Sequence, residues 1–364
     1  MDRTISLREL NRWTLARQLL LERADLDAIG AIEHLAGMQA QYSPSPYIGL
    51  WSRLRAFGRD ELESAVLEDR VLRANLMRGT LHLVSAREFP VYRTAIRSGF
   101  TVYAQMVRRL REAGVDVESV RDELVATVRQ QPIGRGELRR LARGLVPDEH
   151  LAEWAGFSVL ADSGLLMSVA EDALFSRPSI GTTFRLGPQV RVDLLEAWRH
   201  VATAYLRAFG PASRSDLAQW SGEQVALFKP VLDDLDLETV TTEDGRVLLD
   251  LPDAPRPDAE VPAPVRFLPK WDNLLLAYER RERVLPEAYR KVVIRKNGDV
   301  LPTFLVDGLV AGCWLAPLRG KAVMTLEAYS PLSARQRQAV EAEAEGLLAW
   351  LRPDAGRREL RWAA

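Results

Sequence analysis

Two glutamines separated by a single alanine are the side chains whose spacing first suggests chemistry. Gln39-Ala40-Gln41 lies where a helical pattern of apolar residues stops, just before Tyr42-Ser-Pro-Ser-Pro-Tyr47, a stretch that cannot continue a helix. Side chains two positions apart diverge on a helix, but at a helix end or in an extended turn both can reach one site. A carboxamide is not a general base at neutral pH, yet its C=O and NH₂ groups can orient a water molecule. Solvated helix caps are the commoner use of such a pair, so the pattern leaves both interpretations open.

Other catalytic patterns are missing from the sequence. It contains no glycine-rich phosphate loop and no Gly-x-Ser-x-Gly motif. One cysteine, Cys313, and four dispersed histidines form neither a zinc motif nor a disulfide framework, and they favour a reducing compartment. The apolar runs are too short to span a bilayer, and the N-terminal residues lack the apolar core of a secretory signal. We therefore expect a cytoplasmic protein that uses no metal and no cofactor.

An internal repeat organises the middle of the chain. Pro132-Ile-Gly-Arg-Gly-Glu-Leu138 matches Pro211-Ala-Ser-Arg-Ser-Asp-Leu217, with proline, arginine, an acid and leucine aligned at an offset of 79 residues. In each copy, small and capping residues begin a short helix. A second helix is expected after it, at 149–161 in the first copy and at 223–235 in the second.

A β-hairpin is expected after each pair of helices. In the second copy, strands 237–242 and 247–250 flank Asp244-Gly245, a strong signal for a type I′ turn. In the first copy, strands 165–169 and 182–186 are joined by a long loop. Two short helices followed by a hairpin are the order of a winged helix, whose second helix enters the major groove of DNA.

The two ends of the chain predict further units. The N-terminal part is helical and closes with strand 80–84, so it has the order of a third, degenerate copy. After a proline-rich linker at 251–264, the C-terminal part has the pattern of hairpins closed by a helix. Its expected strands and helix are Val292–Ile294 before Asn297-Gly298, 303–306 before Asp307-Gly308, 310–315, and a helix at 332–351 that begins at Ser333.

These patterns together predict a mainly α protein with small β-wings, of the α+β class. Tandem winged-helix units are expected to make up most of the chain, followed by a C-terminal β-element. The four parts are an N-terminal unit with the Gln-x-Gln motif, two further winged-helix units and the β-rich element, at 1–130, 131–190, 191–255 and 256–364.

The charge balance gives a weak argument against a nucleic-acid-binding protein. The net charge is −1, whereas DNA-binding domains usually carry a basic surface. Of the 49 basic residues, however, 44 are arginine, which binds phosphates and guanine edges through its planar guanidinium. Arginine enrichment also arises from a GC-rich genome or from solvated helix faces, so composition alone does not establish DNA binding.

Three segments resemble the AlkZ and YcaQ/AlkX-like DNA glycosylases, and together they extend over nearly the whole chain. They are the Gln-x-Gln motif with the stretch 42–47, then Arg78-Gly79-Thr80-Leu81-His82, and then Phe267–Leu276 with Asn297-Gly298 and Leu305–Gly308. The resemblance implies three winged helices arranged as a C-shaped DNA clamp. It also implies hydrolysis of the N-glycosidic bond of N7-alkylguanine-type lesions, including interstrand crosslinks, in double-stranded DNA. The Gln-x-Gln form is similar to the AlkZ branch, associated with self-resistance to DNA-alkylating natural products, whereas the YcaQ/AlkX branch has Asp in the last position.

The chemistry of such a lesion fits a pair of glutamines. N7-alkylation makes the purine cationic and a good leaving group, so a general acid is not needed. The enzyme then has to stabilise an oxocarbenium-like sugar and place a water molecule beside it. Gln39 and Gln41 are the expected catalytic pair, and their weakness toward an undamaged base makes them a filter against normal DNA. Bulky adducts favour an open cleft over extrusion of the base into a closed pocket.

The resemblance also implies DNA contacts by Arg78, Thr80 and His82. His82 is expected to donate to a phosphate beside the lesion, with a ring buried in the hairpin as the alternative. Arg295 and Lys296 are placed at a hairpin tip, suited either to a DNA groove or to an exposed charged turn.

Three residues are expected to support the active site. Asp272 either organises the reacting water or, as we favour, caps the following helix through its carboxylate. Trp271 stands where we expect Phe in this family, a change that reshapes the neighbouring pocket. Tyr42 directly follows the Gln-x-Gln motif.

The predicted function is therefore that of a metal-independent, monofunctional DNA glycosylase in a bacterial cytoplasm, associated with the nucleoid when bound to DNA. Its partner is double-stranded DNA with bulky N7-alkylated purines or crosslinks, and no protein partner is evident. The alternatives are a winged-helix transcriptional regulator and a non-catalytic protein that binds DNA lesions. Gln39 and Gln41 discriminate between them, because a regulator has no reason to place a polar pair at that position.

Overall fold

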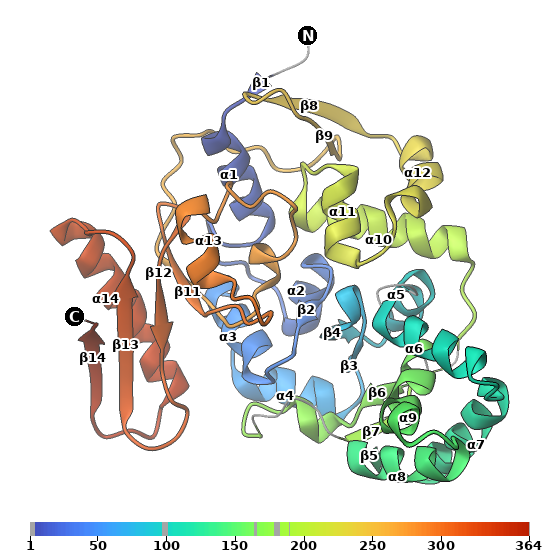
Figure 1. The fold of residues 1–364 in the computed structure, drawn as a ribbon. Coiled ribbons are helices and arrows are strands. Elements are labelled where there is room, and N and C mark those ends of the chain that lie inside the picture. The colour runs from blue at the N-terminus through green and yellow to red at the C-terminus, as the bar shows by residue number, and fades with distance from the viewer. Residues whose placement is uncertain (1–3, 97–100, 164–165, 178–182, 189, 364) are drawn as a thin grey trace.

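Capping residues and a proline define the helix boundaries in the N-terminal part of the computed structural model, which describes residues 4–96, 101–163, 166–177, 183–188 and 190–363 (Figure 1). Ser6 caps the first helix through a capping box with Glu9. Pro44 lies in the first turn of the third helix, so the proline-containing stretch begins a helix. The elements of this part are β1 (Thr4–Ile5), α1 (Leu7–Arg17), α2 (Ala28–His34), β2 (Met38–Gln39), α3 (Pro44–Arg53), α4 (Arg59–Leu67), β3 (Val71–Asn75), the 3₁₀ turn η1 (Met77–Gly79), β4 (Leu81–Ser85) and α5 (Phe89–Ala95).

A group of four helices and three short strands follows, at the lower right of Figure 1. The elements are α6 (Thr101–Glu112), α7 (Val117–Gln130), β5 (Ile133–Gly134), α8 (Arg135–Leu145), α9 (Glu149–Ser163), β6 (Leu166–Ser168), the 3₁₀ turn η2 (Ala170–Ala173) and β7 (Thr183–Leu186). β6 and β7 pair antiparallel, as expected for the hairpin of the first repeat.

The second repeat also has the order helix, helix, hairpin. Ser213 forms a capping box with Asp216 and begins α11 (Arg214–Ser221), which lies between α10 (Leu194–Phe209) and α12 (Val225–Asp234). The predicted hairpin is present as β8 (Glu238–Thr242) and β9 (Val247–Asp250), with Gly245 in the left-handed region at φ 79°.

The C-terminal part contains a five-stranded sheet and a closing helix capped by Ser333. Its elements are β10 (Arg266–Leu268), the 3₁₀ turn η3 (Asn273–Leu275), α13 (Glu287–Val293), β11 (Thr303–Val306), β12 (Leu309–Leu315), β13 (Ala322–Ala328), α14 (Ala334–Leu351) and β14 (Arg358–Trp362). The expected strand at Val292–Ile294 is wrong, because Val293 ends α13 and only Ile294 forms a single bridge, to Val300.

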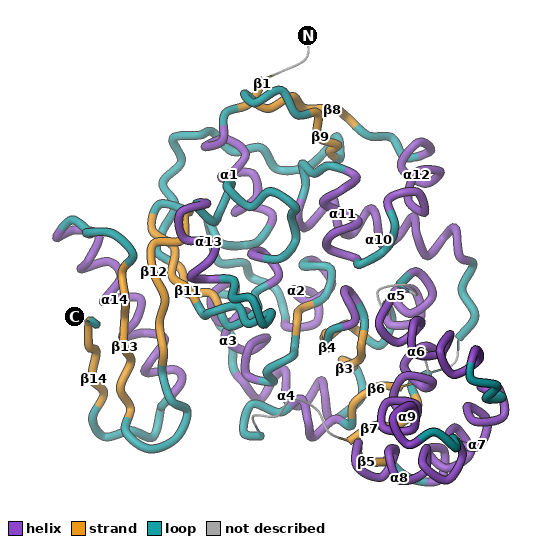
Figure 2. Tube along the Cα trace, in the orientation of Figure 1, coloured by secondary structure: helices purple, strands orange, loops and turns teal. Residues whose placement is uncertain are grey.

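The sheets join parts of the chain that lie far apart in sequence (Figure 2). A six-stranded sheet in the order β2-β4-β3-β6-β7-β5 connects the N-terminal hairpin with the hairpin of the first repeat, through a bridge between Ala74 and Met167. A three-stranded sheet places β1 parallel to β8, with Ile5 opposite Thr242. The result is a mixed α/β protein in which strands cross the boundaries that the sequence predicted.

The clusters of buried apolar side chains do not follow the unit boundaries that the sequence predicted. Apolar side chains from Val107 to Phe184 form one separate cluster, which unites α6 and α7 with α8, α9 and β7. α6 and α7, which the sequence placed before the boundary at residue 130, thus share this cluster with the elements that follow it. The N-terminal and C-terminal parts share a different core, in which Ile32 and Leu50 join Phe304 and Leu347. Among the described residues, no helix combines the length and apolarity that crossing a membrane requires.

Candidate active site

Gln39 ends a strand at the edge of the six-stranded sheet, and Gln41 follows two residues later, in the bend after the strand. β2 pairs antiparallel with β4, so Gln39 lies opposite His82, and the N–H of Ala40 donates to the carbonyl of Leu81 at 2.7 Å. Side chains two positions apart on an extended chain project from the same face. Both glutamines line the same cleft, described below, while Ala40 packs in the core. An extended segment, and not a helix end, holds the pair.

A tight turn directs the chain from α2 into this strand. Ala36 and Gly37 both have positive φ, at 56° and 84°. A Cβ on Gly37 would lie 3.0 Å from Val84 Cγ1 and 3.2 Å from the carbonyl oxygen of Leu83. Glycine at this position satisfies both the left-handed conformation and the close approach of β4.

Hydrogen bonds fix the amide oxygens of both glutamines. Gln39 is 6% exposed, and its Oε1 accepts from Arg78 Nη2 at 2.8 Å. Gln41 is half-buried, and its Oε1 accepts from the backbone N–H of Leu81 at 3.3 Å. Each carbonyl oxygen has a second lone pair, and each amide NH₂ group has two further hydrogens to donate.

Arg78 lies directly behind Gln39 in the η1 turn. Its guanidinium donates to the carbonyl of Trp220 at 2.6 Å and to Asn273 Oδ1 at 3.0 Å, in addition to Gln39. Burial lowers the pKa of Arg78 to about 10, and the nearby cation of Arg281 adds to this shift. The DNA contact expected of Arg78 stays a prediction, since Arg78 lines the cleft described below, and its guanidinium connects Gln39 with α11 and η3.

His82 is a buried residue in this structure and not a surface contact. Its side chain is fully inaccessible, and its Nδ1 lies 3.0 Å from the carbonyl oxygen of Thr80. Burial, followed by the charge of Arg78, lowers the pKa of His82 to about 3, so the ring is neutral at physiological pH. The buried position agrees with the alternative of a hairpin histidine, and the phosphate contact stays a prediction.

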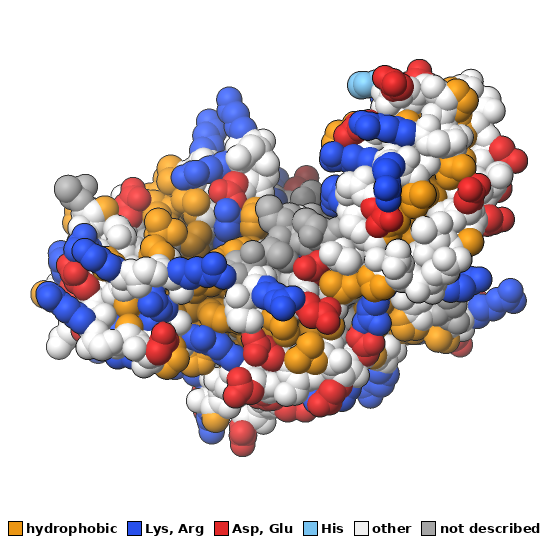
Figure 3. Space-filling view, turned by 90° about the horizontal axis from the view of Figure 1, so that it is seen from below, with side chains coloured by type: hydrophobic (Ala, Val, Ile, Leu, Met, Phe, Trp, Pro, Cys, Tyr) orange, Lys and Arg blue, Asp and Glu red, His pale blue; other side chains and the backbone are white. Residues whose placement is uncertain are grey.

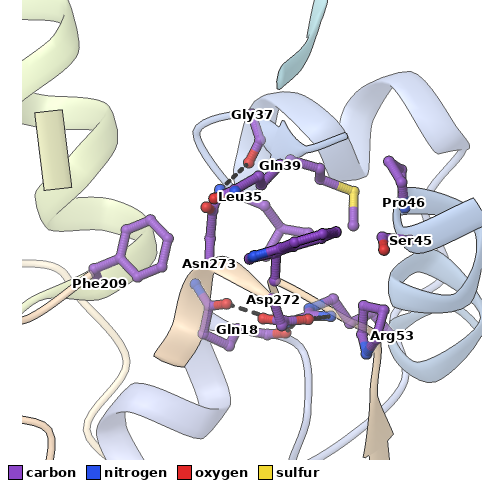
Figure 4. A pocket seen from close by; sticks show the side chains of 13 residues that line it. Gln18, Leu35, Gly37, Gln39, Ser45, Pro46, Arg53, Phe209, Asp272 and Asn273 are labelled. Carbon is purple, nitrogen blue, oxygen red and sulfur yellow. Dashed lines mark hydrogen bonds and ion pairs between the residues drawn. The ribbon is translucent and has the colours of Figure 1, made fainter. Parts of the chain in front are cut away.

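Asp272 caps the short helix η3, which confirms the role favoured from the sequence. Its carboxylate accepts from the N–H of Leu274 at 3.0 Å. The same carboxylate forms a bidentate ion pair with Arg53, with both N···O distances at 3.0 Å, and both side chains are buried. The next residue, Asn273, donates to the carbonyl of Gly37 at 3.3 Å. Figure 4 shows these groups around a small cavity of about 20 Å³ behind Gln39, roughly the space of one water molecule.

An open cleft of about 410 Å³ lies in front of the two glutamines. Its lining comes from three parts of the chain: Gln39, Gln41, Asn75, Arg78, Gly79, Thr80 and Leu81; then Tyr103, Arg135, Phe157 and Phe184; and then Trp271, Leu276, Asn297 and Gly298. Seen from below, the molecule is hollowed between the unit on the right and the rest of the chain, and Lys and Arg side chains lie on both sides of the hollow (Figure 3).

The wall contributed by the second unit is aromatic. The Arg135 guanidinium lies over the ring of Phe157 at 4.4 Å, and Tyr103 and Phe184 contact the same ring with centroid distances of 5.2 Å. Sequence reasoning missed these residues, because nothing in their local pattern indicates that α6, α8 and α9 face the Gln-x-Gln strand.

The turn at Arg295 and Lys296 lies at the rim of the cleft. Both side chains are exposed, and the turn is closed by the N–H of Arg295, which donates to the carbonyl of Asp299 at 2.8 Å. Trp271, at the same rim, donates from its indole Nε1 to the carbonyl of Gly298 at 2.9 Å. The described lining of the cleft includes Thr80 and Trp271. Tyr42, which follows Gln41 in the sequence, is half-buried and is not part of this lining.

A model of the DNA glycosylase AlkZ-like family matches residues 32–350. The chain belongs to this family of DNA glycosylases. One relative from Streptomyces sahachiroi, described as an interstrand DNA cross-link repair glycosylase, is 27% identical over 326 residues, which cover 85% of this chain and 87% of the relative. The solved structure of the Streptomyces sahachiroi DNA glycosylase AlkZ is similar in fold, with a TM-score of 0.79 and 22% identity over 99% of this chain and 100% of that one.

Membership in the AlkZ-like family makes this protein a hydrolytic DNA glycosylase, so DNA is its substrate. Within the described ranges, no three His, Cys, Asp or Glu side chains are grouped so that they could hold a metal ion. Asn273 is a polar residue that sequence reasoning passed over, and it accepts from the same Arg78 nitrogen as Gln39. It was quoted within the segment 267–276, but its contact with Arg78 depends on the tertiary fold.

Proposed function

We propose that this AlkZ-like glycosylase excises bulky N7-alkylated purines, including crosslinked ones, with a water molecule positioned by Gln39 and Gln41. The observation that carries the proposal is that Gln39, at the end of an edge strand, and Gln41, two residues later, line the same open cleft. The description of the Streptomyces relative as a cross-link repair glycosylase supports the same class of lesion.

The proposed reaction requires little from the protein beyond position and polarity. The bond between C1′ of the sugar and N9 of the purine breaks, and its electron pair removes the positive charge that N7-alkylation created. The oxygen of the held water then bonds to C1′, and its proton passes to solvent. A water that accepts from one glutamine and donates to the other keeps one lone pair free for C1′. Such placement lowers the entropic part of the barrier.

The cleft is suited to a large adduct. Its volume of about 410 Å³ is within the range of small-molecule sites, and it is open on one side. The aromatic rings of Tyr103 and Phe157 lie across from the glutamines, where a planar or apolar substituent on the base would contact them. An open cleft also avoids the need to extrude a bulky base into a closed pocket.

The helix, helix, hairpin segments supply the surfaces for holding the duplex in this proposal. We infer that α8–α9 with β6–β7 and α11–α12 with β8–β9 act as winged-helix units on the two sides of the cleft. Arg295 and Lys296 extend the cationic rim on the C-terminal side. A clamp of this kind binds mainly through phosphates and therefore without strong sequence preference.

Single-turnover excision of an alkylated purine tests the proposal. Gln39→Ala and Gln41→Ala should each lower the rate of base release, with DNA affinity nearly unchanged because neither residue is charged. The double variant should lose less than the product of the two effects, because both amides hold one water. N7-methylguanine should show the milder effect, and a bulkier N7-adduct the larger one.

Gln131→Ala serves as the control, since Gln131 is an exposed glutamine at the end of α7. The catalytic assignment fails if Gln39→Ala and Gln41→Ala release base as fast as the unsubstituted enzyme. If their rates fall only in proportion to weaker binding, the glutamines are DNA contacts. If the unsubstituted enzyme releases no alkylated purine, the proposed substrate class is wrong.

A further inference from the structure

A glutamine amide has two ends of nearly the same shape and opposite hydrogen-bonding character. The oxygen accepts, and the NH₂ group donates. For a glutamine that holds a reacting water, the end that faces the cleft decides whether it holds the water by its oxygen or by its hydrogens. An isolated Gln39 side chain would have no reason to prefer one end.

The contacts of Arg78 remove this ambiguity. Arg78 Nη2 donates to Gln39 Oε1 at 2.8 Å, and an arginine has no atom that can accept a hydrogen bond. The opposite orientation would place the Gln39 NH₂ group against a guanidinium, two donors facing each other in a buried setting. With the oxygen held inward, the Gln39 NH₂ group is the end that remains for the cleft.

Arg78 itself is held from three directions. Nη1 donates to the carbonyl of Trp220 at 2.6 Å, near the C-terminal end of α11, where the helix dipole favours a cation. Nη2 also donates to Asn273 Oδ1 at 3.0 Å. In the described part of the chain, the cation of Arg281 is the charge that lowers the pKa of Arg78, and no carboxylate pairs with it. The guanidinium is therefore held by neutral acceptors, of which Gln39 is one.

The backbone at Arg78 is unusual for a side chain of this kind. Arg78 adopts the left-handed region at φ 56° and ψ 17°, and Gly79 follows at φ 69°. Non-glycine residues seldom adopt this conformation, and where they do it frequently marks a functional site. Asn75 Nδ2 supports the turn by donating to the carbonyl of Gly79 at 2.9 Å. The turn aims the Arg78 side chain back toward the Gln-x-Gln strand.

We propose that Arg78 is a positioning residue that fixes the Gln39 amide with its oxygen inward and its NH₂ group toward the cleft, so that Gln39 donates to the oxygen of the reacting water. Gln41 then supplies the acceptor. Its Oε1 takes the N–H of Leu81 at 3.3 Å and has a second lone pair for a water hydrogen. The two glutamines thus have different roles although their side chains are chemically identical: Gln39 donates to the water, and Gln41 accepts from it. This inference rests on the proposed catalytic role of Gln39.

Two substitutions of opposite design test the assignment. Gln39→Glu preserves the shape and gives Arg78 a charged partner, but it removes the NH₂ group. Base release should fall about 10- to 100-fold, the effect of losing a hydrogen bond to a charged or reacting group, while thermal stability is retained or raised. Arg78→Gln should lower base release by a similar factor at unchanged DNA affinity, because the amide is then free to turn.

Arg78→Lys adds a readout that a merely structural role would not change. Burial lowers the pKa of a lysine ammonium from about 10.4. The Arg78→Lys variant should therefore release base at neutral pH but lose activity between about pH 7 and 9, while the unsubstituted enzyme changes little over that range. Arg283→Lys is the matched control, since Arg283 is buried, donates to the carbonyl of Pro211 at 2.8 Å and has no contact with Gln39. It should keep a flat pH profile.

The outcomes separate the two levels of the proposal. If Gln39→Ala lowers base release but Gln39→Glu keeps the full rate, Gln39 acts through an oxygen, and the assigned orientation is wrong. If Arg78→Gln keeps the full rate and Arg78→Lys has a flat profile, Arg78 does not position Gln39. If Gln39→Ala does not change the rate of base release, Gln39 has no catalytic role, and the orientation of its amide does not affect catalysis.

Discussion

Replacing Asp272 with asparagine should damage stability far more than catalysis. Asp272 and Arg53 form two parallel hydrogen bonds at 3.0 Å, and their side chains are 3% and 2% exposed. Asp272→Asn keeps the shape of the side chain but leaves the Arg53 guanidinium buried without a counter-charge. Removing one partner of a buried ion pair costs about 3–5 kcal/mol. For a chain of this length that corresponds to a fall in Tm of roughly 4–7 °C.

The assay combines thermal unfolding with single-turnover base release at a temperature where the variant is folded. Asp250→Asn is a suitable control, because the Asp250 ion pair with Arg17 is equally buried but lines neither the cleft nor the small cavity beside Gln39. Both variants should lose stability, and both should release base within about threefold of the unsubstituted rate, a difference below 1 kcal/mol. The double variant Arg53→Met/Asp272→Asn should be less destabilised than the two single effects combined, by about 1–3 kcal/mol.

Two results would refute this reasoning. If the Asp272→Asn variant has the same Tm as the unsubstituted protein, the ion pair contributes little to stability. A variant that stays stable but loses base release by more than tenfold would make Asp272 part of the water-holding site, the alternative that the sequence left open.

Three further changes have expected outcomes. The pKa of His82 is lowered to about 3 in the folded state, below the unfolded value of about 6.5. The unfolded chain therefore binds the proton first, and the free energy of unfolding falls as pH decreases from about 6.5 to about 3. In urea titrations between about pH 6.5 and 5, His82→Gln should remove up to about 1.4 kcal/mol of this loss per pH unit. Arg295→Ala and Lys296→Ala should weaken DNA binding alike for all sequences and reduce the salt dependence measured by fluorescence anisotropy, whereas a sequence-dependent effect would contradict a phosphate or rim role. Tyr103→Ala should reduce the preference for a bulky N7-adduct over N7-methylguanine by a few-fold in competition assays, and an unchanged ratio would exclude contact between this wall and the adduct.

Features that depend on a few neighbouring residues were predictable from the sequence. The capping boxes at Ser6 and Ser333 mark helix starts in the structure, and Asp244-Gly245 and Asp307-Gly308 lie in the hairpins where they were expected. In each case, a short-range hydrogen bond or a positive φ restricts the residue type, so the sequence alone indicates the structure. The Asp272 cap belongs to the same group.

Features that depend on long-range packing were not predictable. Nothing local indicates that α6 and α7 belong to the core of the following helices, or that Val292 lies in a helix. Gln39 and Gln41 were recognised, but the strand that holds them depends on pairing with β4. The partners of Arg78, which are Trp220 and Asn273, come from distant segments, and no periodicity in the sequence connects them.

The parallel pairing of β1 with β8 has a consequence for how the protein is made. The N-terminus leaves the ribosome first. Ile5, however, pairs with Thr242, and Arg12 forms an ion pair with Asp307, and both partners are synthesised much later. The two glutamines that we propose as catalytic leave the ribosome early, but Asn273, which accepts a hydrogen bond from Arg78, is synthesised long afterwards. A nascent or prematurely terminated chain therefore carries the Gln-x-Gln motif without its support. Excision activity is then a property of nearly complete chains, and fragments of this enzyme should not cleave DNA bases during their own synthesis.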